Sequence, residues 1–268
     1  MIKFNNKLIT QETFGDGTLK CEVPFPLPLG NGKYDTKTIM WCYDNDAELF
    51  TLICLVDYLR DHYPQAPRKL ILPYIPHARQ DREVSSRLFT LKSFAKVINS
   101  LDFIEVEYYD PHSDVAKALI DRGSFVYSPF MVSYKDCAVM YPDAGAAKKY
   151  GAVEGVENPI IGNKHRNEEG RIDSYELVNF IEGTKKVIIR DDICSYGGTF
   201  VAAAKELRKR GVEEIVLVVT HCENAILKGE VFEYIDRVFT TDSILTVSHP
   251  KITIARSFRK ENNDNVQN

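Results

Sequence analysis

The chain has 268 residues, of which 44% are hydrophobic and 27% are charged, and its formal net charge is −4. This length allows one large or two modest domains, and a slightly acidic chain has no basic field to attract nucleic acid or an anionic membrane. No apolar run approaches the ~20 residues that span a bilayer, and the N-terminal stretch lacks a signal-peptide core, so we expect a cytoplasmic protein.

The first half of the chain alternates apolar, β-rich runs with segments of helical character. Helices are predicted at 45–60, where Asn45 and Glu48 have capping-box spacing, and at 90–100. Strands are predicted at 38–42, 69–74 and 104–109.

The second half repeats this alternation. Helices are predicted at 144–152 and 201–211, and strands at 138–142, 186–190, 214–221 and 252–258. The polar stretch 162–176 interrupts this set and is predicted to be a long mobile loop. We expect the tail at 260–268 to be disordered.

Strands that alternate with helices of this length indicate parallel βαβ units. The two sets, joined near 127–137, therefore predict an α/β protein with two similar domains, each an open, mostly parallel sheet flanked by helices. We expect an N-terminal domain at 1–135, a C-terminal domain at 136–246, and a final strand with a polar tail at 247–268. The six cysteines have no C-x-x-C spacing and are expected to be reduced thiols.

Ligands of open α/β sheets bind at the carboxyl ends of the strands. Four polar segments follow predicted strands in this way, and we expect the functional residues there. They are P-Y-I-P-H-A-R-Q-D-R-E (73–83), Y-D-P-H-S-D (109–114), Y-P-D-A-G (141–145) and R-D-D-I-C-S-Y-G-G-T (190–199).

The segment R-D-D-I-C-S-Y-G-G-T ends where a helix is predicted to begin. Backbone N–H groups and the helix dipole favour an anion there, and glycines let a phosphate approach the backbone. Asp191 and Asp192 are suited to bind ribose hydroxyls or a hard divalent ion, and Thr199 adds a hydroxyl donor. The order of strand, acid pair, loop and helix predicts a ribose-phosphate site. The alternative is an ordinary strand–turn–helix with exposed acids.

In A-R-Q-D-R-E (78–83), Arg79 and Arg82 suit contacts with phosphate or with the face of an adenine. Gln80 can read the edge of a base. Taken alone, a solvated charged loop fits this segment equally well.

His112 in D-P-H-S-D follows a predicted strand and suits a metal or a phosphate, although a lone histidine is more often structural. Lys164 and Arg166 alternate in N-K-H-R, within the predicted loop. Two cations on a lid can neutralise a transferring phosphoryl group, whereas the alternative is a solvated basic turn.

Over residues 14–245, these segments resemble, in the same order, the ribose-phosphate diphosphokinases, also called PRPP synthetases. P-Y-I-P-H-A-R-Q-D-R-E is similar to that family's P-Y-x-x-Y-A-R-Q-D-R-K, and D-D-I-C-S-Y-G-G-T to its D-D-x-x-D-T-A-G-T. The other similar segments are F-G-D-G-T (14–18), D-P-H-S-D, P-D-A-G, N-K-H-R and F-T-T-D-S-I (239–244).

The resemblance implies two type I phosphoribosyltransferase-like domains. It also implies transfer of the β,γ-diphosphoryl group of ATP to the anomeric 1-hydroxyl of a ribose 5-phosphate unit, with Mg²⁺ as cofactor and AMP released. The implied catalytic residues are Lys164 and Arg166, and those that bind ATP are Phe14, Asp16, Arg79, Gln80, Asp81 and His112. Metal binding is implied for His112 and Asp143, and acceptor binding for Asp143, Asp191, Asp192, Ser195, Gly197, Gly198 and Thr199, with Arg190 and Tyr196 added from this chain's own loop.

Several residues depart from the family pattern. Thr18 replaces an acid, Asp114 replaces an uncharged residue, and no helix is predicted after the strand at 252–258. Since the family's C-terminal contacts support hexamers and allostery, we expect a smaller homo-oligomer here, a dimer or larger.

The phosphate loop departs most. S-Y-G-G-T lacks the acid and the alanine methyl of D-T-A-G-T and gains Tyr196, while Arg190 stands where an aliphatic residue is usual. These changes favour an acceptor larger than ribose 5-phosphate, such as the ADP-ribose used by some phage-encoded relatives in rebuilding NAD. The side chain of Arg190 could instead point to the opposite face and pair with an acid. Both acceptors remain open.

Two other classes share some of these features. A phosphoribosyltransferase would share the acid-pair loop but would not need A-R-Q-D-R-E and D-P-H. A non-catalytic regulatory relative would usually lose the cationic loop or the acid pair, both of which this chain keeps.

Overall fold

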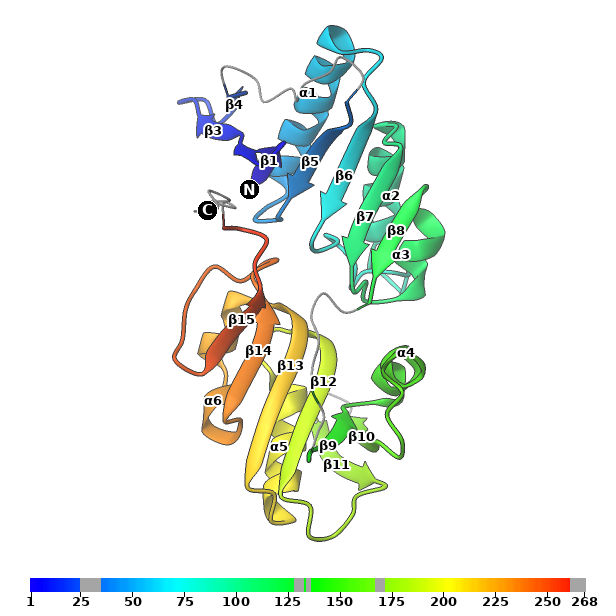
Figure 1. Ribbon diagram of the computed structural model, residues 1–268, viewed down its shortest axis with the longest axis vertical. Coiled ribbons are helices and arrows are strands. Elements are labelled where there is room, and N and C mark those ends of the chain that lie inside the picture. Colours follow the sequence, from blue (N-terminus) through cyan, green and yellow to red (C-terminus); the bar gives the residue numbers. More distant parts are fainter. Residues whose placement is uncertain (25–34, 128–132, 134–135, 167–171, 261–268) are drawn as a thin grey trace, which may run out of the picture. The chain divides into compact units, whose positions relative to one another are not determined.

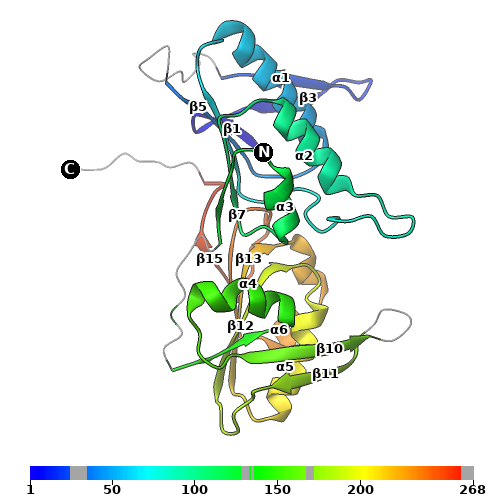
Figure 2. The same cartoon turned by 90° about the vertical axis from the view of Figure 1, so that its right-hand side faces the viewer.

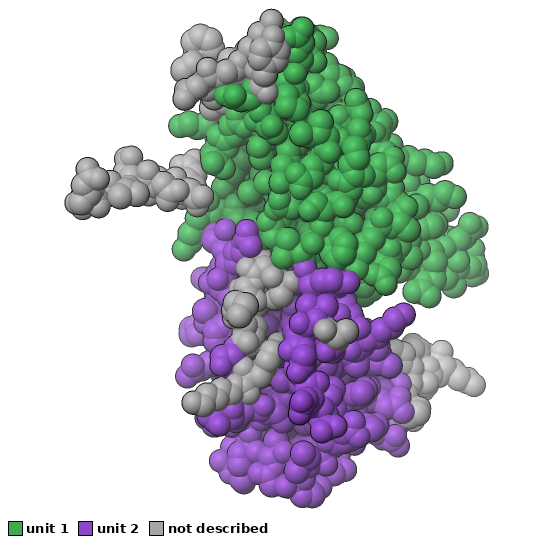
Figure 3. Space-filling model, turned by 45° about the vertical axis from the view of Figure 1, so that its right-hand side comes forward, with its two compact units in different colours: residues 1–126, 258–268 green, residues 127–257 purple. Residues whose placement is uncertain are grey.

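The computed structural model describes residues 1–24, 35–127, 133, 136–166 and 172–260, without the side chains of residues 152, 165, 166, 172 and 173. The chain divides into two compact units, coloured separately in Figure 3: unit 1 contains Met1–Val126 and Phe258–Asn268, and unit 2 contains Tyr127–Ser257. The division at 126/127 differs from the predicted one at 135/136. The segment predicted as a separate end, 247–268, is shared between the units, and most of its predicted disordered tail lies outside the described residues.

Unit 1 is built on a six-stranded sheet with the order β2-β1-β5-β6-β7-β8. Strands β5 to β8 are parallel, whereas β1 is antiparallel to β2 and to β5. A two-stranded hairpin of β3 and β4 stands apart from this sheet (Figure 1). The strands are β1 (Ile2–Phe4), β2 (Lys7–Leu8), β3 (Thr10–Thr13), β4 (Leu19–Glu22), β5 (Lys37–Trp41), β6 (Arg68–Leu72), β7 (Glu105–Tyr109) and β8 (Gly123–Val126).

Three helices of unit 1 pack on one face of its sheet (Figure 2): α1 (Ala47–His62), α2 (Thr90–Ser100) and α3 (Asp114–Leu119). One continuous core joins them to the strands, because alternate residues of β5 such as Ile39 and Trp41 are buried against the helices. The loops after β6 and β7 therefore leave the sheet side by side, at its carboxyl edge.

Unit 2 contains a seven-stranded sheet with the order β11-β10-β9-β12-β13-β14-β15. Its strands are parallel except for the edge strand β11. The strands are β9 (Ala138–Tyr141), β10 (Ile160–Arg166), β11 (Ile172–Val178), β12 (Lys186–Cys194), β13 (Glu214–Cys222), β14 (Arg237–Thr241) and β15 (Ile252–Arg256).

Helices cover both faces of the unit 2 sheet. Val187 and Ile189 of β12 share a core with α5 (Gly198–Lys209), whereas Val139 and Tyr141 of β9 pack against α4 (Ala144–Glu154). A 3-10 helix, η1 (Asn224–Lys228), and the short α6 (Val231–Tyr234) follow β13. Among the helices in the described part of the chain, none is long and apolar enough to cross a bilayer.

The structure confirms the predicted α/β class and most of its elements. Helix α2 begins and ends at the predicted residues, and β6, β7, β9 and β13 end within two residues of the prediction. Two predictions about the site were wrong. The segment 162–176 is not a plain loop, because β10 and β11 pair within it as an antiparallel hairpin. The acid pair does not follow its strand but lies within it, since β12 continues to Cys194.

Candidate active site

The acid pair, Asp191 and Asp192, lies near the carboxyl end of β12, which pairs with β13. The ladder between these parallel strands extends to the pair Cys194 and Cys222, so both acids are held by a continuous sheet. Asp192 is buried, whereas Asp191 is half-buried and its Oδ1 accepts the backbone N–H of Asp192 at 2.9 Å. Burial, the neighbouring Asp192 carboxylate and the more distant Asp143 together raise the pKa of Asp191 well above its ordinary value. This is a site of concentrated negative charge.

Asp143 caps helix α4 and also binds the predicted catalytic lysine. One carboxylate oxygen accepts the backbone N–H of Ala146 at 3.0 Å, and the other accepts the Lys164 ammonium at 2.8 Å. Burial alone would raise the pKa of Asp143, but the hydrogen bonds from Lys164 and Ala146 outweigh it and lower the pKa below its ordinary value. The structure therefore brings together Lys164 and Asp143, which the sequence had assigned to separate segments.

Tyr175 is a residue of this site that the sequence did not single out. It lies on β11 directly opposite Lys164, and its hydroxyl donates to the carbonyl of Pro142 at 2.8 Å. Burial, followed by the charges of Asp143 and Asp191, raises the pKa of Tyr175 above its ordinary value. The alternation in I-D-S-Y-E-L-V was the available signal, because it is typical of a half-buried strand.

The predicted phosphate loop forms the N-terminus of α5, as expected. Gly197 precedes the helix with a left-handed φ of 79°, and its carbonyl accepts the N–H of Val201 at 2.9 Å. Tyr196 is 59% exposed and Thr199 is half-buried. A Cβ at Gly229 would come within 2.0 Å of the Tyr196 carbonyl oxygen, so Gly229 lets the following segment pack closely against the loop.

Two departures in this loop have structural causes. A Cβ on Gly197 would lie 2.1 Å from Cγ2 of Val231, so the missing methyl makes room for α6. Ser195 donates a short hydrogen bond to the carboxylate of Glu223, the residue after β13. A carboxylate therefore still lies next to residue 195, although another segment of the chain supplies it. Val231 thus fills the space of the missing methyl, and Glu223 supplies a carboxylate next to Ser195.

Arg190, which was predicted to contact the acceptor, lies in the interior of unit 2. Its side chain is fully buried, and its guanidinium stacks on the ring of Tyr150 at 4.0 Å. Nε of Arg190 donates to Glu154 of α4 at 3.0 Å, and Nη1 donates to the backbone carbonyl of Asp191. The alternative left open by the sequence, a pair with an acid on the opposite face, is what the structure contains. Arg190 fixes the acid-pair strand to α4 and does not face a ligand.

The second predicted catalytic residue, Arg166, is the last residue of β10, and its side chain lies outside the described residues. Lys149 of α4, the helix on which Arg190 packs, lies 3.8 Å from Asp192. Lys149 is half-buried, so it adds a cation beside the buried carboxylate of Asp192.

In unit 1, the loops after β6 and β7 meet as predicted. Asp81 is buried, and Arg82 donates to it at 3.0 Å. Burial would raise the pKa of Asp81, but the hydrogen bond and the charge of Arg82, with the charge of His112, outweigh it and lower this pKa below its ordinary value. His112 and Arg79 are exposed at this edge, whereas the side-chain oxygen Oε1 of Gln80 accepts the hydroxyl of Thr90, at the start of α2, at 2.6 Å.

Phe14 and Asp16 lie at the tip of the β3–β4 hairpin and are not part of the Asp81 group. Phe14 is 53% exposed, and Asp16 accepts hydrogen bonds from the backbone and the hydroxyl of Thr18. The hairpin is anchored on α1, where Gln11 donates to Thr51 at 2.5 Å. The hairpin is a two-stranded sheet of its own, separate from the six-stranded sheet whose strands β6 and β7 precede the other predicted ATP-binding residues.

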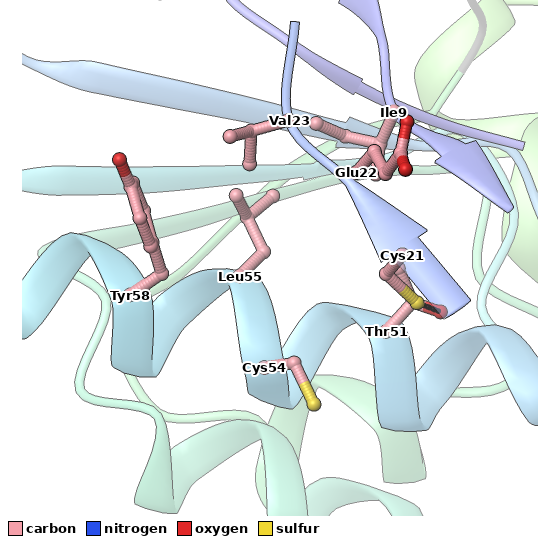
Figure 4. A pocket seen from close by; sticks show the side chains of 8 residues that line it. All are labelled: Ile9, Cys21, Glu22, Val23, Thr51, Cys54, Leu55 and Tyr58. Carbon is pink, nitrogen blue, oxygen red and sulfur yellow. Dashed lines mark hydrogen bonds between the residues drawn. The ribbon is translucent and has the colours of Figure 1, made fainter. Parts of the chain in front are cut away.

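A hollow of about 460 Å³ lies between β4 and α1, away from these predicted residues (Figure 4). Its walls are mostly apolar, and the thiol of Cys54 and the ring of Tyr58 line it along α1. It contains none of the predicted site residues, so it does not identify the active site.

The fold and the site define a class of protein. A family model for the phosphoribosyl transferase domain matches residues 86–252, which is more than half of the chain. The crystal structure of phosphoribosylpyrophosphate synthetase from Mycobacterium smegmatis has a TM-score of 0.70 and 19% sequence identity, and the match covers 93% of this chain and 86% of that one. At this identity the likeness shows the fold, which is of the phosphoribosyl transferase type.

Sequence relatives narrow the class to one family. The ribose-phosphate pyrophosphokinase of Helicobacter hepaticus is 30% identical over 231 residues, which cover 80% of this chain and 73% of that protein. That of Thermococcus kodakarensis is 29% identical over 234 residues, or 81% of both chains. The chain therefore belongs to the ribose-phosphate pyrophosphokinase family. The predicted family, fold class and enzyme class are confirmed.

Proposed function

We propose that this enzyme transfers the β,γ-diphosphoryl group of ATP to the 1-hydroxyl of ribose 5-phosphate, which yields the 1-diphosphate and AMP. The observation that carries the proposal is the arrangement in unit 2. An acid pair in β12 adjoins a glycine loop at the N-terminus of α5, and Lys164 is held on Asp143 beside the acid pair. The acid pair suits the hydroxyls of a ribose, the glycine loop suits its phosphate, and Lys164 suits a transferring phosphoryl group.

Each group has a distinct role in the proposed reaction. Asp191 accepts hydrogen bonds from ribose hydroxyls and so orients the 1-hydroxyl, while the N–H groups of the loop 195–199 bind the 5-phosphate. The 1-hydroxyl oxygen attacks the β-phosphorus, the bond from that phosphorus to the oxygen bridging the α-phosphate breaks, and AMP leaves with this oxygen. The hydroxyl proton is released, and Lys164 neutralises the charge that develops on the phosphates.

Mg²⁺ fits this site as a partner of the substrate phosphates. Mg²⁺ is usually held by one or two carboxylates together with phosphate oxygens rather than by an all-protein cage. Asp143 and Asp191 offer such carboxylates, and no cluster of three potential metal ligands occurs among the described residues. The bound ion would offset the negative charge that these acids and the phosphates bring together, and His112 remains a proposed ligand of the ATP side.

Ribose 5-phosphate is favoured over ADP-ribose as the acceptor. Arg190 is buried against Glu154, and the space freed at Gly197 is filled by Val231, so two of the features that favoured a larger acceptor have structural explanations. Only the exposed Tyr196, among the loop's described side chains, still offers a surface for a further group. The relatives' name, ribose-phosphate pyrophosphokinase, supports the same choice.

Release of AMP from ATP with Mg²⁺ tests the proposal. We expect ribose 5-phosphate to stimulate AMP release strongly and ADP-ribose to do so weakly. Stimulation by ADP-ribose alone would replace the proposed acceptor with the larger one. If neither acceptor acts, the enzyme proposal fails, and a non-catalytic relative becomes the better account. We also propose an assembly of two or more copies in the cytoplasm, with small-molecule substrates and no nucleic acid, in keeping with the net charge of −4.

A further inference from the structure

The hairpin that carries Lys164 runs past the end of its neighbouring strand. β10 pairs with β9 only at Ile160 and Ile161, because β9 ends at Tyr141, where the chain turns through Pro142 into α4. From Gly162 onward the ladder contacts of β10 are with β11, an edge strand. The segment that bears Lys164 is therefore not held by the parallel sheet, and side chains must set its position against Asp143.

Tyr175 supplies one such contact, because its hydroxyl donates to the Pro142 carbonyl, one residue before Asp143. Gly162 makes room for this hydroxyl. A Cβ at residue 162 would lie 2.0 Å from Oη of Tyr175, 2.6 Å from Cζ and 2.7 Å from the Pro142 carbonyl oxygen. The close approach of β10 to the Pro142 turn thus requires a glycine at 162 and a hydroxyl at 175.

The hydrogen bond from Tyr175 to the Pro142 carbonyl, called the tether below, is made by the residue that pairs with the catalytic lysine. Tyr175 and Lys164 are direct partners across the hairpin, and the Lys164 ammonium contacts Asp143 at 2.8 Å. The Tyr175 ring packs against the hydrophobic core that includes residues of α5, and this packing fixes the position of its hydroxyl. Lys164, by contrast, has a flexible side chain, so the location of its ammonium depends on where the backbone of β10 is held.

We propose that Tyr175, together with Gly162, is a positioning residue that sets Lys164 against Asp143. This inference rests on the proposed function, in which Lys164 neutralises charge on the phosphates. Tyr175 does not touch the reacting atoms in this account, and it acts through the placement of Lys164.

A double-mutant cycle tests the inference. Tyr175→Phe removes the tether and keeps the ring, so we expect kcat to fall about tenfold, as for the loss of one buried hydrogen bond, while KM for ATP and for the acceptor stays within about twofold. In a Lys164→Ala background the same change should have no further effect on kcat, because the positioned group is gone. Gly162→Ala should also lower kcat, because its Cβ would lie 2.0 Å from the Tyr175 hydroxyl oxygen and so displace it.

The matched control is Tyr234→Phe, which removes a tyrosine hydroxyl in the same unit and keeps the ring on which the Lys205 ammonium stacks at 4.6 Å, and which leaves kcat unchanged. An unchanged kcat in Tyr175→Phe, or an equal loss in the Lys164→Ala background, would overturn the inference. Amide hydrogen exchange gives a readout that does not depend on activity. Amides of β10 and β11 should exchange faster in Tyr175→Phe, and unchanged exchange would contradict the tether even if the wild-type protein released no AMP and the proposed function failed.

Discussion

At the scale of single residues, two adjacent glycines begin α5 with different requirements. Gly197 has a left-handed φ of 79°, and a Cβ there would meet Val231 at 2.1 Å. Gly198 is the first helical residue, and a Cβ on it would meet nothing within 4 Å. The sequence shows only G-G, so the distinction depends on a backbone angle and on a neighbour more than thirty residues away.

This distinction predicts opposite signs for the same substitution. Gly197→Ala should destabilise the protein by at least about 1–2 kcal/mol, which is the cost of the left-handed backbone alone, with the contact to Val231 in addition. Gly198→Ala should stabilise it by about 0.5–1 kcal/mol, because alanine loses less entropy in a helix. Urea unfolding of both variants measures the difference, and equal shifts in the two would contradict the account. The further change Val231→Ala should relieve part of the cost at residue 197.

At the scale of elements, Arg190 and Glu154 join the acid-pair strand β12 to helix α4. Both side chains are largely removed from water, with exposures of 0% and 10%, and Nε of Arg190 lies 3.0 Å from Glu154. The same guanidinium also donates to the Asp191 carbonyl, so this buried pair links the position of α4, which is capped by Asp143, to the position of the acids.

Breaking this pair from one side should be costly. Arg190→Met alone should destabilise the protein by about 3–5 kcal/mol, because it leaves the Glu154 carboxylate buried without its partner charge. The double variant Arg190→Met with Glu154→Leu should recover part of this loss, since no unpaired charge then remains. Chemical unfolding of the two single variants and the double variant gives the coupling. Strictly additive losses would show that the two residues do not act as a pair.

The sequence predicted the elements better than it predicted the edges of the site. The long apolar run of β13 and the amphipathic pattern of α2 could be assigned from the sequence alone. In both elements, the spacing of the apolar residues follows from which faces of the element are buried. The β10–β11 hairpin was missed because the polar run N-K-H-R in β10 has no strand pattern, and the partial alternation in β11 does not identify its pairing partner. The pairing is accompanied by tertiary contacts such as that of Tyr175 with Pro142. The orientation of Arg190 could not be predicted, because a charge in a strand does not reveal which face of the sheet it occupies.

Some residues of the site could be predicted from the sequence, whereas others could not. Asp143 and Asp191 could be selected from their place after or near buried strands, which follows from the topology of an open sheet. Lys164 was selected differently, as one of two alternating cations in a segment predicted to be a loop. The role of Glu223 beside Ser195 could not, because it depends on the register of β12 with β13 rather than on any local pattern.

At the scale of the whole molecule, the chain leaves unit 1 after Val126 and returns to it at Phe258. The return is anchored by Lys3 of β1, which is 5% exposed and whose ammonium donates to three backbone carbonyls: Phe258 at 3.3 Å, Arg259 at 2.8 Å and Lys260 at 3.0 Å. Phe258 is buried against Tyr109, with ring centroids 4.9 Å apart. The three donors of one lysine thus match three acceptors of the returning chain.

Removal of this anchor should weaken unit 1. Lys3→Met keeps the length of the side chain but loses all three donors, and we expect a loss of about 2–3 kcal/mol in the free energy of unfolding, typical for hydrogen bonds to a buried charge. Lys7→Met, an exposed position on the neighbouring strand β2, is the control and should have little effect. The result can be read from urea unfolding, and a wild-type midpoint for Lys3→Met would refute the anchor.

The central claim is that this enzyme moves two phosphoryl groups as one unit, and the fate of labelled ATP tests it most directly. With ATP labelled in the β-phosphate, ribose 5-phosphate and Mg²⁺, the account predicts that the label appears in the sugar product together with the γ-phosphate, in amounts equal to the AMP released. Label that stays in ADP, with only the γ-phosphate on the sugar, would contradict it and would make the enzyme a simple phosphoryl kinase.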